Sequence, residues 1–282
     1  MVRSTRLTTG QWLLTTDVQV NALASGSSGN AYLVRSGATA VLVEAGLPAS
    51  RLAKFLQGLA FDPRLLDGIL LTHAHSDHLR GARELSDLYR VPVYATPGTL
   101  GHRTLRDAPG ARPIPVGRSF ELGDLEILPF RVPHDCVEPV GFRISGEQGT
   151  VCLTTDLGFV PEEVCSQLEG ADLLVLEANH DEAMLWRGPY PAFLKQRVGG
   201  DCGHLSNSAA ARCLVGLERR PPRAVWLAHL SLVNNRVATA LEAIRGALDG
   251  AGLGHVSVAT VGRNRPSLRW QAQPPAEQLA LF

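Results

Sequence analysis

Residues 71–78 read Leu-Thr-His-Ala-His-Ser-Asp-His and place three histidines and an aspartate within six positions. They follow a short apolar run that is typical of a buried strand. On extended backbone alternate side chains share a face, so His73 and His75 can point at one ion. Asp77 and His78 come where the chain turns toward a helix and can face a second ion. The alternative is a surface loop that is rich in histidine by chance. The chain has only nine histidines, so a chance cluster of three within six residues is a weak explanation for this pattern.

Strand-like and helix-like segments recur in the same order in both halves of the chain. The clearest strand patterns cover residues 17–23, 31–34, 39–43, 68–71, 91–94, 120–122, 125–128, 139–144, 150–155, 173–176, 224–227 and 256–259. The clearest helical patterns cover residues 48–59, 79–89, 205–217 and 237–248. No internal linker separates the halves. We therefore expect an α/β fold, a four-layer αββα sandwich of two mixed β-sheets flanked by helices.

Composition limits the classes of protein that the chain can belong to. With 45% hydrophobic and 19% charged residues in 282, it can bury a sizeable core. Its 27 basic residues equal its 27 acidic ones, so a nucleic-acid partner needs a local basic patch. Five cysteines without a C-x-x-C pair, no signal peptide and no long apolar run predict a cytoplasmic protein without a membrane span. We expect a loose lead-in at residues 1–16, one domain at 17–270 and a flexible tail at 271–282.

Three further residues of metal-ligand type follow predicted strands in the second half of the chain. His134, Asp156 and His229 each come at the end of a predicted strand, at residues 130–132, 152–155 and 225–228. A single histidine at a strand end is usually an ordinary polar cap. Imidazole and carboxylate groups are, however, the ligands that zinc and related transition metals prefer. Three such residues in a chain that already carries His-x-His-x-Asp-His favour one joint metal site.

These segments resemble the metallo-β-lactamase superfamily, whose signature is the His-x-His-x-Asp-His loop followed by later His, Asp and His residues. Within it the chain is similar to the YycJ/WalJ-like hydrolases, which are related to tRNase Z and PhnP. The resemblance rests on residues 23–30, 71–78, 134–135, 176–181, 188–191, 203–207 and 227–231. It covers most of residues 20–236. The chain departs from the family at Glu44, where an Asp-x-Gly sequence is usual.

The resemblance implies two metal sites that share one bridging ligand. The ligands would be His73, His75 and His134 for the first ion, Asp77, His78 and His229 for the second, and Asp156 between them. Glu44 would brace the metal loop from behind. Zn²⁺ suits these ligands best, and Mn²⁺ or Fe²⁺ is chemically acceptable. Two such ions would share a bridging hydroxide that serves as the nucleophile.

Other residues are expected to act on the substrate. Glu177 and His204 resemble the pair that assists leaving-group departure in tRNase Z, so we expect them to be catalytic together with Asp77. A histidine held by a carboxylate keeps its proton near neutral pH, although a structural histidine is the alternative for His204. The Gly/Ser-rich loop can bind phosphate, or it can be a plain hairpin. The candidates for substrate contact are Ser27, Ser28 and Asn30 of this loop, and His180, which could instead shape its own loop.

A metal-dependent phosphodiesterase, most simply a DNA exonuclease, is the function that these residues favour. An RNA-processing nuclease similar to tRNase Z and a small-molecule cyclic phosphodiesterase similar to PhnP are alternatives, as is a glyoxalase II-type thioesterase. A fourth alternative is a non-catalytic module that lost its metals. Arginines at positions 103, 106, 112 and 118 offer a candidate patch for a nucleic-acid backbone, or an ordinary solvated face.

The C-terminal residues give an independent indication of the substrate. Residues 278–282 read Gln-Leu-Ala-Leu-Phe and follow a polar, proline-containing tether. They resemble the peptide that bacterial proteins use to bind the DNA sliding clamp. A chance match and a tail that folds back on its own domain are the alternatives. If the clamp is a partner, through Gln278, Leu279, Leu281 and Phe282, then DNA is favoured over RNA.

Overall fold

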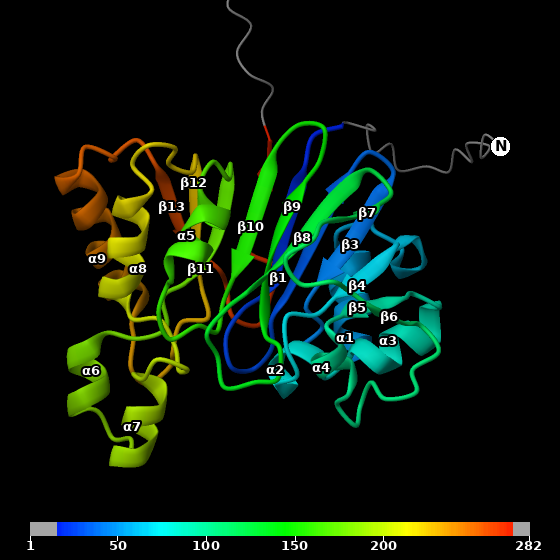
Figure 1. Ribbon diagram of the computed structural model, residues 1–282, viewed down its shortest axis with the longest axis horizontal. Coiled ribbons are helices and arrows are strands. Elements are labelled where there is room, and N and C mark those ends of the chain that lie inside the picture. Colours follow the sequence, from blue (N-terminus) through cyan, green and yellow to red (C-terminus); the bar gives the residue numbers. More distant parts are fainter. Residues whose placement is uncertain (1–15, 273–282) are drawn as a thin grey trace, which may run out of the picture.

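Two seven-stranded β-sheets pack face to face, and helices cover their outer faces (Figure 1). The computed structural model describes residues 16–272. The strand order is β14-β1-β2-β3-β4-β5-β6 in the first sheet and β13-β12-β11-β10-β9-β8-β7 in the second. Both sheets contain parallel and antiparallel pairs. The predicted four-layer αββα sandwich is confirmed.

The first sheet is built from the N-terminal half of the chain and one C-terminal strand. Its strands are β1 (Gln19–Ala24), β2 (Ala31–Ser36), β3 (Thr39–Val43), β4 (Gly68–Leu70), β5 (Val93–Ala95), β6 (Ala111–Pro113) and β14 (Leu268–Gln271). The helices of this half are α1 (Ala49–Gly58), the 3-10 turn η1 (Pro63–Leu65), α2 (Ser76–Leu79), α3 (Ala82–Tyr89) and α4 (Pro97–Leu100). In β3, Val41 and Val43 pack between the sheets and Leu42 packs toward the helices. A strand buried on both faces reads as a continuous apolar run.

The second half repeats this arrangement. Its strands are β7 (Phe120–Leu122), β8 (Leu125–Arg131), β9 (Val140–Ser145), β10 (Thr150–Thr154), β11 (Leu173–Glu177), β12 (Ala224–Ala228) and β13 (Ser257–Thr260). Its helices are α5 (Glu162–Leu168), α6 (Glu182–Arg187), α7 (Ala192–Val198), α8 (Asn207–Gly216) and α9 (Val237–Gly250). α8 and α9 pack on the outer face of this sheet, while α6 and α7 extend beyond its edge (Figure 1).

Parallel pairing places the polar strand ends together. β3 pairs in parallel with β4, and β11 lies between β10 and β12 with both pairs parallel. The carboxyl ends of parallel strands meet at one edge of a sheet, and ligands usually bind there. Each of these strands is followed by a candidate site residue. The two sheets therefore deliver their polar loops to a common edge of the sandwich, where α2 also lies (Figure 1).

The predicted boundary between the domain and the tail is wrong by two residues. Gln271 pairs with Gln19 in the first sheet, and the amide of Ala272 donates to Val18 O at 2.9 Å. β14 covers the outer side of β1, which would otherwise be an unpaired sheet edge. The predicted clamp-binding peptide at 278–282 lies outside the described residues and stays a prediction. Within 16–272, no helix has the length and apolar character needed to cross a bilayer.

Candidate metal centre

Three imidazoles converge at the end of β4. His75 Nδ1 lies 3.1 Å from His73 Nε2 and 3.2 Å from His134 Nε2. Burial, followed by the neighbouring His78, lowers the pKa of His73 well below its ordinary value. Burial, followed by His134, likewise lowers the pKa of His75. These two rings are therefore neutral, the form of imidazole that binds a metal ion. The structure brings together all three residues predicted for the first ion.

The outer ring nitrogens of this group have fixed partners. The Thr72 hydroxyl lies 2.8 Å from His73 Nδ1, and the carbonyl oxygen of Gly203 lies 3.1 Å from His134 Nδ1. A carbonyl oxygen only accepts, so the Nδ1–H of His134 donates to Gly203 O and its Nε2 faces the cluster. Such outer hydrogen bonds orient metal-binding histidines. The backbone around the cluster therefore holds His134 in the tautomer that a cation needs.

A second group lies beside the first. His229 Nε2 is 3.3 Å and His78 Nε2 is 3.6 Å from Asp77 Oδ2. Asp156 lies between the groups: its Oδ2 is 3.1 Å from His78 Nε2, and its Oδ1 is 3.3 Å from His229 Nδ1. Ligand atoms of His73, His78 and Asp156 also lie within 4.8 Å of one another. The residues predicted for the second ion and for the bridge are thus assembled.

The buried charges of this region are not satisfied by hydrogen bonds alone. Burial raises the pKa of Asp156, but His229 and His78 outweigh it and hold that pKa well below its ordinary value. Conversely, burial lowers the pKa of His229, while Asp156, Asp77 and Glu177 raise it to about 10. Asp156 Oδ2 is buried, and its close polar contact is His78 Nε2 at 3.1 Å. A buried carboxylate needs positive charge nearby, and a divalent cation fits this donor set as a replacement for imidazolium.

Glu44 contacts the metal loop in spite of its longer side chain. It is buried, accepts the backbone N–H of Thr72 at 3.2 Å, and places the same oxygen 3.4 Å from His78 Nδ1. Glu44, Asp156 and His229 all have left-handed backbone, with φ of 67°, 61° and 54°. Non-glycine residues in this region are uncommon and concentrate at functional sites. Here the sharp turn directs each side chain from a strand end back into the site.

Glu177 and His204 form a tightly held pair next to these groups. His204 Nδ1 lies 2.8 Å and His229 Nδ1 lies 3.0 Å from Glu177 Oε1. The other carboxylate oxygen accepts the backbone N–H groups of Leu157 and Leu205, each at 3.1 Å. Burial raises the pKa of Glu177, but His204 and His229 outweigh it and lower that pKa to about 2. Glu177 is therefore ionised, and it raises the pKa of His204 against the opposing effect of burial.

The residues predicted to contact substrate divide into two pairs. Ser27 is exposed and lines the cavity over the metal-ligand groups, and Ser28 donates to Asn264 at 3.0 Å away from that lining. Asn30 is fully buried, and its backbone N–H donates to Asp77 O at 2.8 Å. His180 is 3% exposed and does not line the cavity. Neither Asn30 nor His180 lines the cavity, so substrate contact by them stays a prediction; Asn30 contacts the metal loop, and His180 fits the loop-shaping alternative.

The cavity has a volume of about 300 Å³ and contains residues that the sequence did not indicate. Asp135 and Arg197 meet at its rim, where Arg197 donates to Asp135 Oδ2 at 2.8 Å through Nε and at 2.7 Å through a terminal nitrogen. Burial raises the pKa of Asp135, but Arg197 outweighs it and lowers it. The position of Asp135 beside His134 was a usable signal. No sequence signal indicated Arg197, because its neighbours in sequence carry no metal-site pattern.

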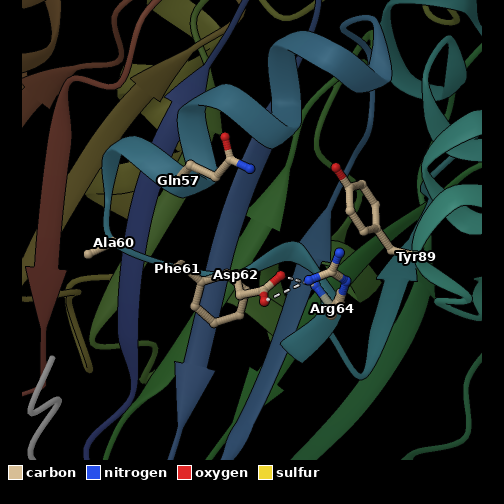
Figure 2. A pocket seen from close by; sticks show the side chains of 6 residues that line it. All are labelled: Gln57, Ala60, Phe61, Asp62, Arg64 and Tyr89. Carbon is tan, nitrogen blue, oxygen red and sulfur yellow. Dashed lines mark hydrogen bonds and ion pairs between the residues drawn. The ribbon is translucent and has the colours of Figure 1, made fainter. Parts of the chain in front are cut away.

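A second hollow lies between the end of α1, η1 and the end of α3 (Figure 2). Figure 2 shows the side chains of Asp62 and Arg64 facing each other, with Gln57 and Tyr89 around them. The two charges lie 3.6 Å apart and are largely exposed to solvent. They neutralise each other, and apart from Asp62 no His, Cys, Asp or Glu lines this hollow. The chemistry of the molecule is therefore concentrated at the metal-ligand groups.

Comparisons of the sequence and of the structure with known proteins agree with the predicted resemblance. The family described as the beta-lactamase superfamily domain matches residues 39–230. The exodeoxyribonuclease WalJ of Streptococcus pneumoniae strain D39 is 35% identical over 222 residues, which cover 76% of this chain and 81% of WalJ. The exodeoxyribonuclease YycJ of Bacillus anthracis is 33% identical over 238 residues, 83% of this chain and 90% of YycJ. The metallo-β-lactamase fold protein YhfI of Bacillus subtilis superposes with a TM-score of 0.67 at 19% identity, covering 92% of this chain and all of YhfI.

Proposed function

This chain belongs to the metallo-β-lactamase superfamily, as a hydrolase of the YycJ/WalJ type, and from this premise we propose that it is a two-metal DNA exonuclease. The observation that carries the proposal is the pair of ligand groups joined by Asp156. The neighbouring Glu177–His204 pair supports a phosphodiester substrate, because such a bond needs a proton for its leaving oxygen. Similarity to two proteins named exodeoxyribonucleases supports DNA.

Two cations would divide these residues between them. His73, His75 and His134 would hold one, Asp77, His78 and His229 would hold the other, and Asp156 would serve both. We favour Zn²⁺ for both positions, because five of the seven ligands are imidazoles. When bound, two such cations polarise the phosphodiester and activate water for attack on it.

Other residues next to these ligands are expected to bind the substrate and to supply a proton to it. Glu177 keeps its charge and accepts a hydrogen bond from Nδ1 of His204, which fixes the orientation of that ring. His204 is 23% exposed and lines the cavity, so it can give a proton to the leaving oxygen of the scissile bond. Ser27 at the cavity wall can donate to a phosphate oxygen. Glu177 also holds His229, and it thereby couples the proton donor to the second ligand group.

A substrate panel tests this proposal. We expect metal-supplemented protein to degrade linear DNA and release mononucleotides from an end, and to leave circular single-stranded DNA intact. Linear RNA of the same sequence and bis(p-nitrophenyl) phosphate separate the alternatives, with products resolved by gel and chromatography. Cleavage of RNA in preference to DNA would favour the RNA-processing alternative. Cleavage of the ester alone would contradict nuclease action.

The brace at Glu44 leads to a prediction about metal affinity. The Glu44→Gln variant keeps the size and shape of the side chain, but it removes the charge that lies 3.4 Å from His78 Nδ1. Loss of such an outer partner typically lowers metal affinity about 10–100-fold. Competition with a chromophoric chelator measures this, and Glu126→Gln on an exposed position of β8 is the control. Equal affinities for the two variants would show that Glu44 does not act on the metal loop.

A further inference from the structure

The helical segment from α6 to α7, residues 182–198, projects from the edge of the sandwich that carries the metal-ligand groups (Figure 1). We call it the α6–α7 arm. Leu185 is the one buried residue of α6, and α7 has none. Helices of this length need tertiary packing to be stable in water. The arm thus contributes little to the core, and most of its side chains face the surface.

The surface of the arm carries aromatic rings. Trp186 is 55% and Phe193 is 71% exposed, and the exposed Phe159 follows Asp156 by three residues in the chain. Every other tryptophan, phenylalanine and tyrosine among residues 16–272 is at least partly buried. Leaving large apolar side chains in water is unfavourable, and exposed apolar patches commonly mark interaction sites. Two of the three exposed rings, Trp186 and Phe193, therefore lie on the arm.

The charge on the arm is complementary to an anion. Arg187, Lys195 and Arg197 outnumber its single acid, Glu182. Lys195 Nζ donates to the carbonyl oxygen of Trp186 at 2.8 Å, so α7 is tied to α6 and the aromatic positions are fixed relative to each other. Whereas the chain as a whole is neutral, the arm is locally basic. Aromatic rings interleaved with cations are the usual surface for single-stranded nucleic acid.

The arm is continuous with the metal cavity. Leu194, Arg197 and Val198 line that cavity together with the ligand residues. The backbone N–H of His204 donates to Val198 O at 2.8 Å, so the C-terminal end of α7 is anchored to the loop that carries the proton donor. Arg197 also pairs with Asp135 at the rim. By contrast, none of the arginines at 103, 106, 112 and 118 lines the cavity.

We propose that the α6–α7 arm is the platform on which single-stranded DNA binds, with bases stacked on Trp186 and Phe193 and the strand end guided past Arg197 to the metal centre. This proposal rests on the proposed nuclease function. Single-stranded DNA is the favoured occupant because its base faces are free to stack, whereas those of a duplex are covered. A phosphate backbone also supplies the negative charge that the basic residues of the arm require.

Steady-state kinetics on the metal-loaded full chain tests the platform. Stacking on an aromatic residue is typically worth a factor of about 10 in binding. We therefore expect Phe193→Ala and Trp186→Ala each to raise KM for linear single-stranded DNA about tenfold, and the double variant about 100-fold, with kcat nearly unchanged. Phe193→Tyr and Trp186→Phe keep a stacking surface and should restore KM. Leu88→Ala, at an exposed position on α3, is the control.

Hydrolysis of bis(p-nitrophenyl) phosphate by the same variants separates the platform from the metal centre, because this small ester fits in the cavity, whose lining includes neither Trp186 nor Phe193. Unchanged ester hydrolysis with a raised KM for DNA supports the platform. If the wild-type chain degrades DNA and the alanine variants show unchanged KM, the platform is wrong and the nuclease function stands. If the wild-type chain cleaves the ester but does not degrade linear DNA, the nuclease function fails and the platform fails with it.

Discussion

The Asp156→Asn variant is expected to lose DNA hydrolysis by about 10³-fold or more. Asp156 lies 3.1 Å from His78 and 3.3 Å from His229 of the second ligand group, and within 4.8 Å of His73 of the first. Asparagine fills the same space but carries no charge to hold a cation shared by both groups. Metal ions contribute several kcal/mol of transition-state stabilisation, and each 1.36 kcal/mol is a factor of ten in rate. Loss of either ion therefore accounts for a decrease of this size.

Asparagine is a better replacement than alanine at this position because of the backbone. Asp156 has a φ of 61°, a left-handed conformation that asparagine tolerates and that costs alanine about 1 kcal/mol. Alanine would also open a buried space next to His73 and His78. Activity lost in Asp156→Ala alone could thus result from a distorted strand end. Loss in both variants, with the asparagine form folded, identifies the carboxylate charge as the cause.

Metal content and thermal unfolding provide readouts of this variant that do not depend on activity. A ligand that binds only the native state stabilises it by about 2.7 kcal/mol at 100 times its Kd. The wild-type Tm is therefore expected to rise when Zn²⁺ is added, and that of Asp156→Asn to rise much less. Asp87→Asn, at an exposed position of α3, serves as the control. If Asp156→Asn retains two ions per chain, the bridging assignment is wrong.

The metal centre could be predicted because its ligands obey local rules. The His-x-His-x-Asp-His loop is contiguous in sequence, and His134, Asp156 and His229 each come at the end of a predicted strand. Parallel pairing then brings strand ends to one edge without any further information. The sequence also indicated Glu177 and His204, through a resemblance and not through spacing alone. The 2.8 Å contact between them agrees with that pairing.

Other features depend on long-range packing that no local pattern reveals. Gln271 belongs to a strand only because β1 offers an unpaired edge to it, so the polar sequence around it resembled a tether. Asn30 seemed available to substrate because Gly/Ser-rich loops often bind phosphate. Its loop instead packs beneath the metal loop, where Asn30 is buried. The short helices α6 and α7 bury almost nothing, and so they lack the apolar periodicity that predicts a helix.

His204→Ala is expected to lower kcat for DNA by about 10²–10⁴-fold, the range usual for loss of a general acid. His204 is held 2.8 Å from the ionised Glu177 and lines the cavity, where it can protonate a departing sugar oxygen. Bis(p-nitrophenyl) phosphate does not need this proton, because p-nitrophenolate is a far weaker base than a sugar alkoxide. Its hydrolysis by the variant should therefore remain within a few-fold of the wild-type rate.

The ratio of these two effects distinguishes proton donation from a structural role. His204 also lies 3.4 Å from Asp156, so its removal could disturb the metal-ligand groups instead of the leaving group. Disturbed ligands would slow both substrates equally and reduce metal content, whereas a missing acid slows DNA alone and leaves both ions bound. His255→Ala removes an exposed histidine and should change neither rate. Equal losses on DNA and on the ester would contradict the assignment of His204 as the acid and leave Glu177 as a support for His229.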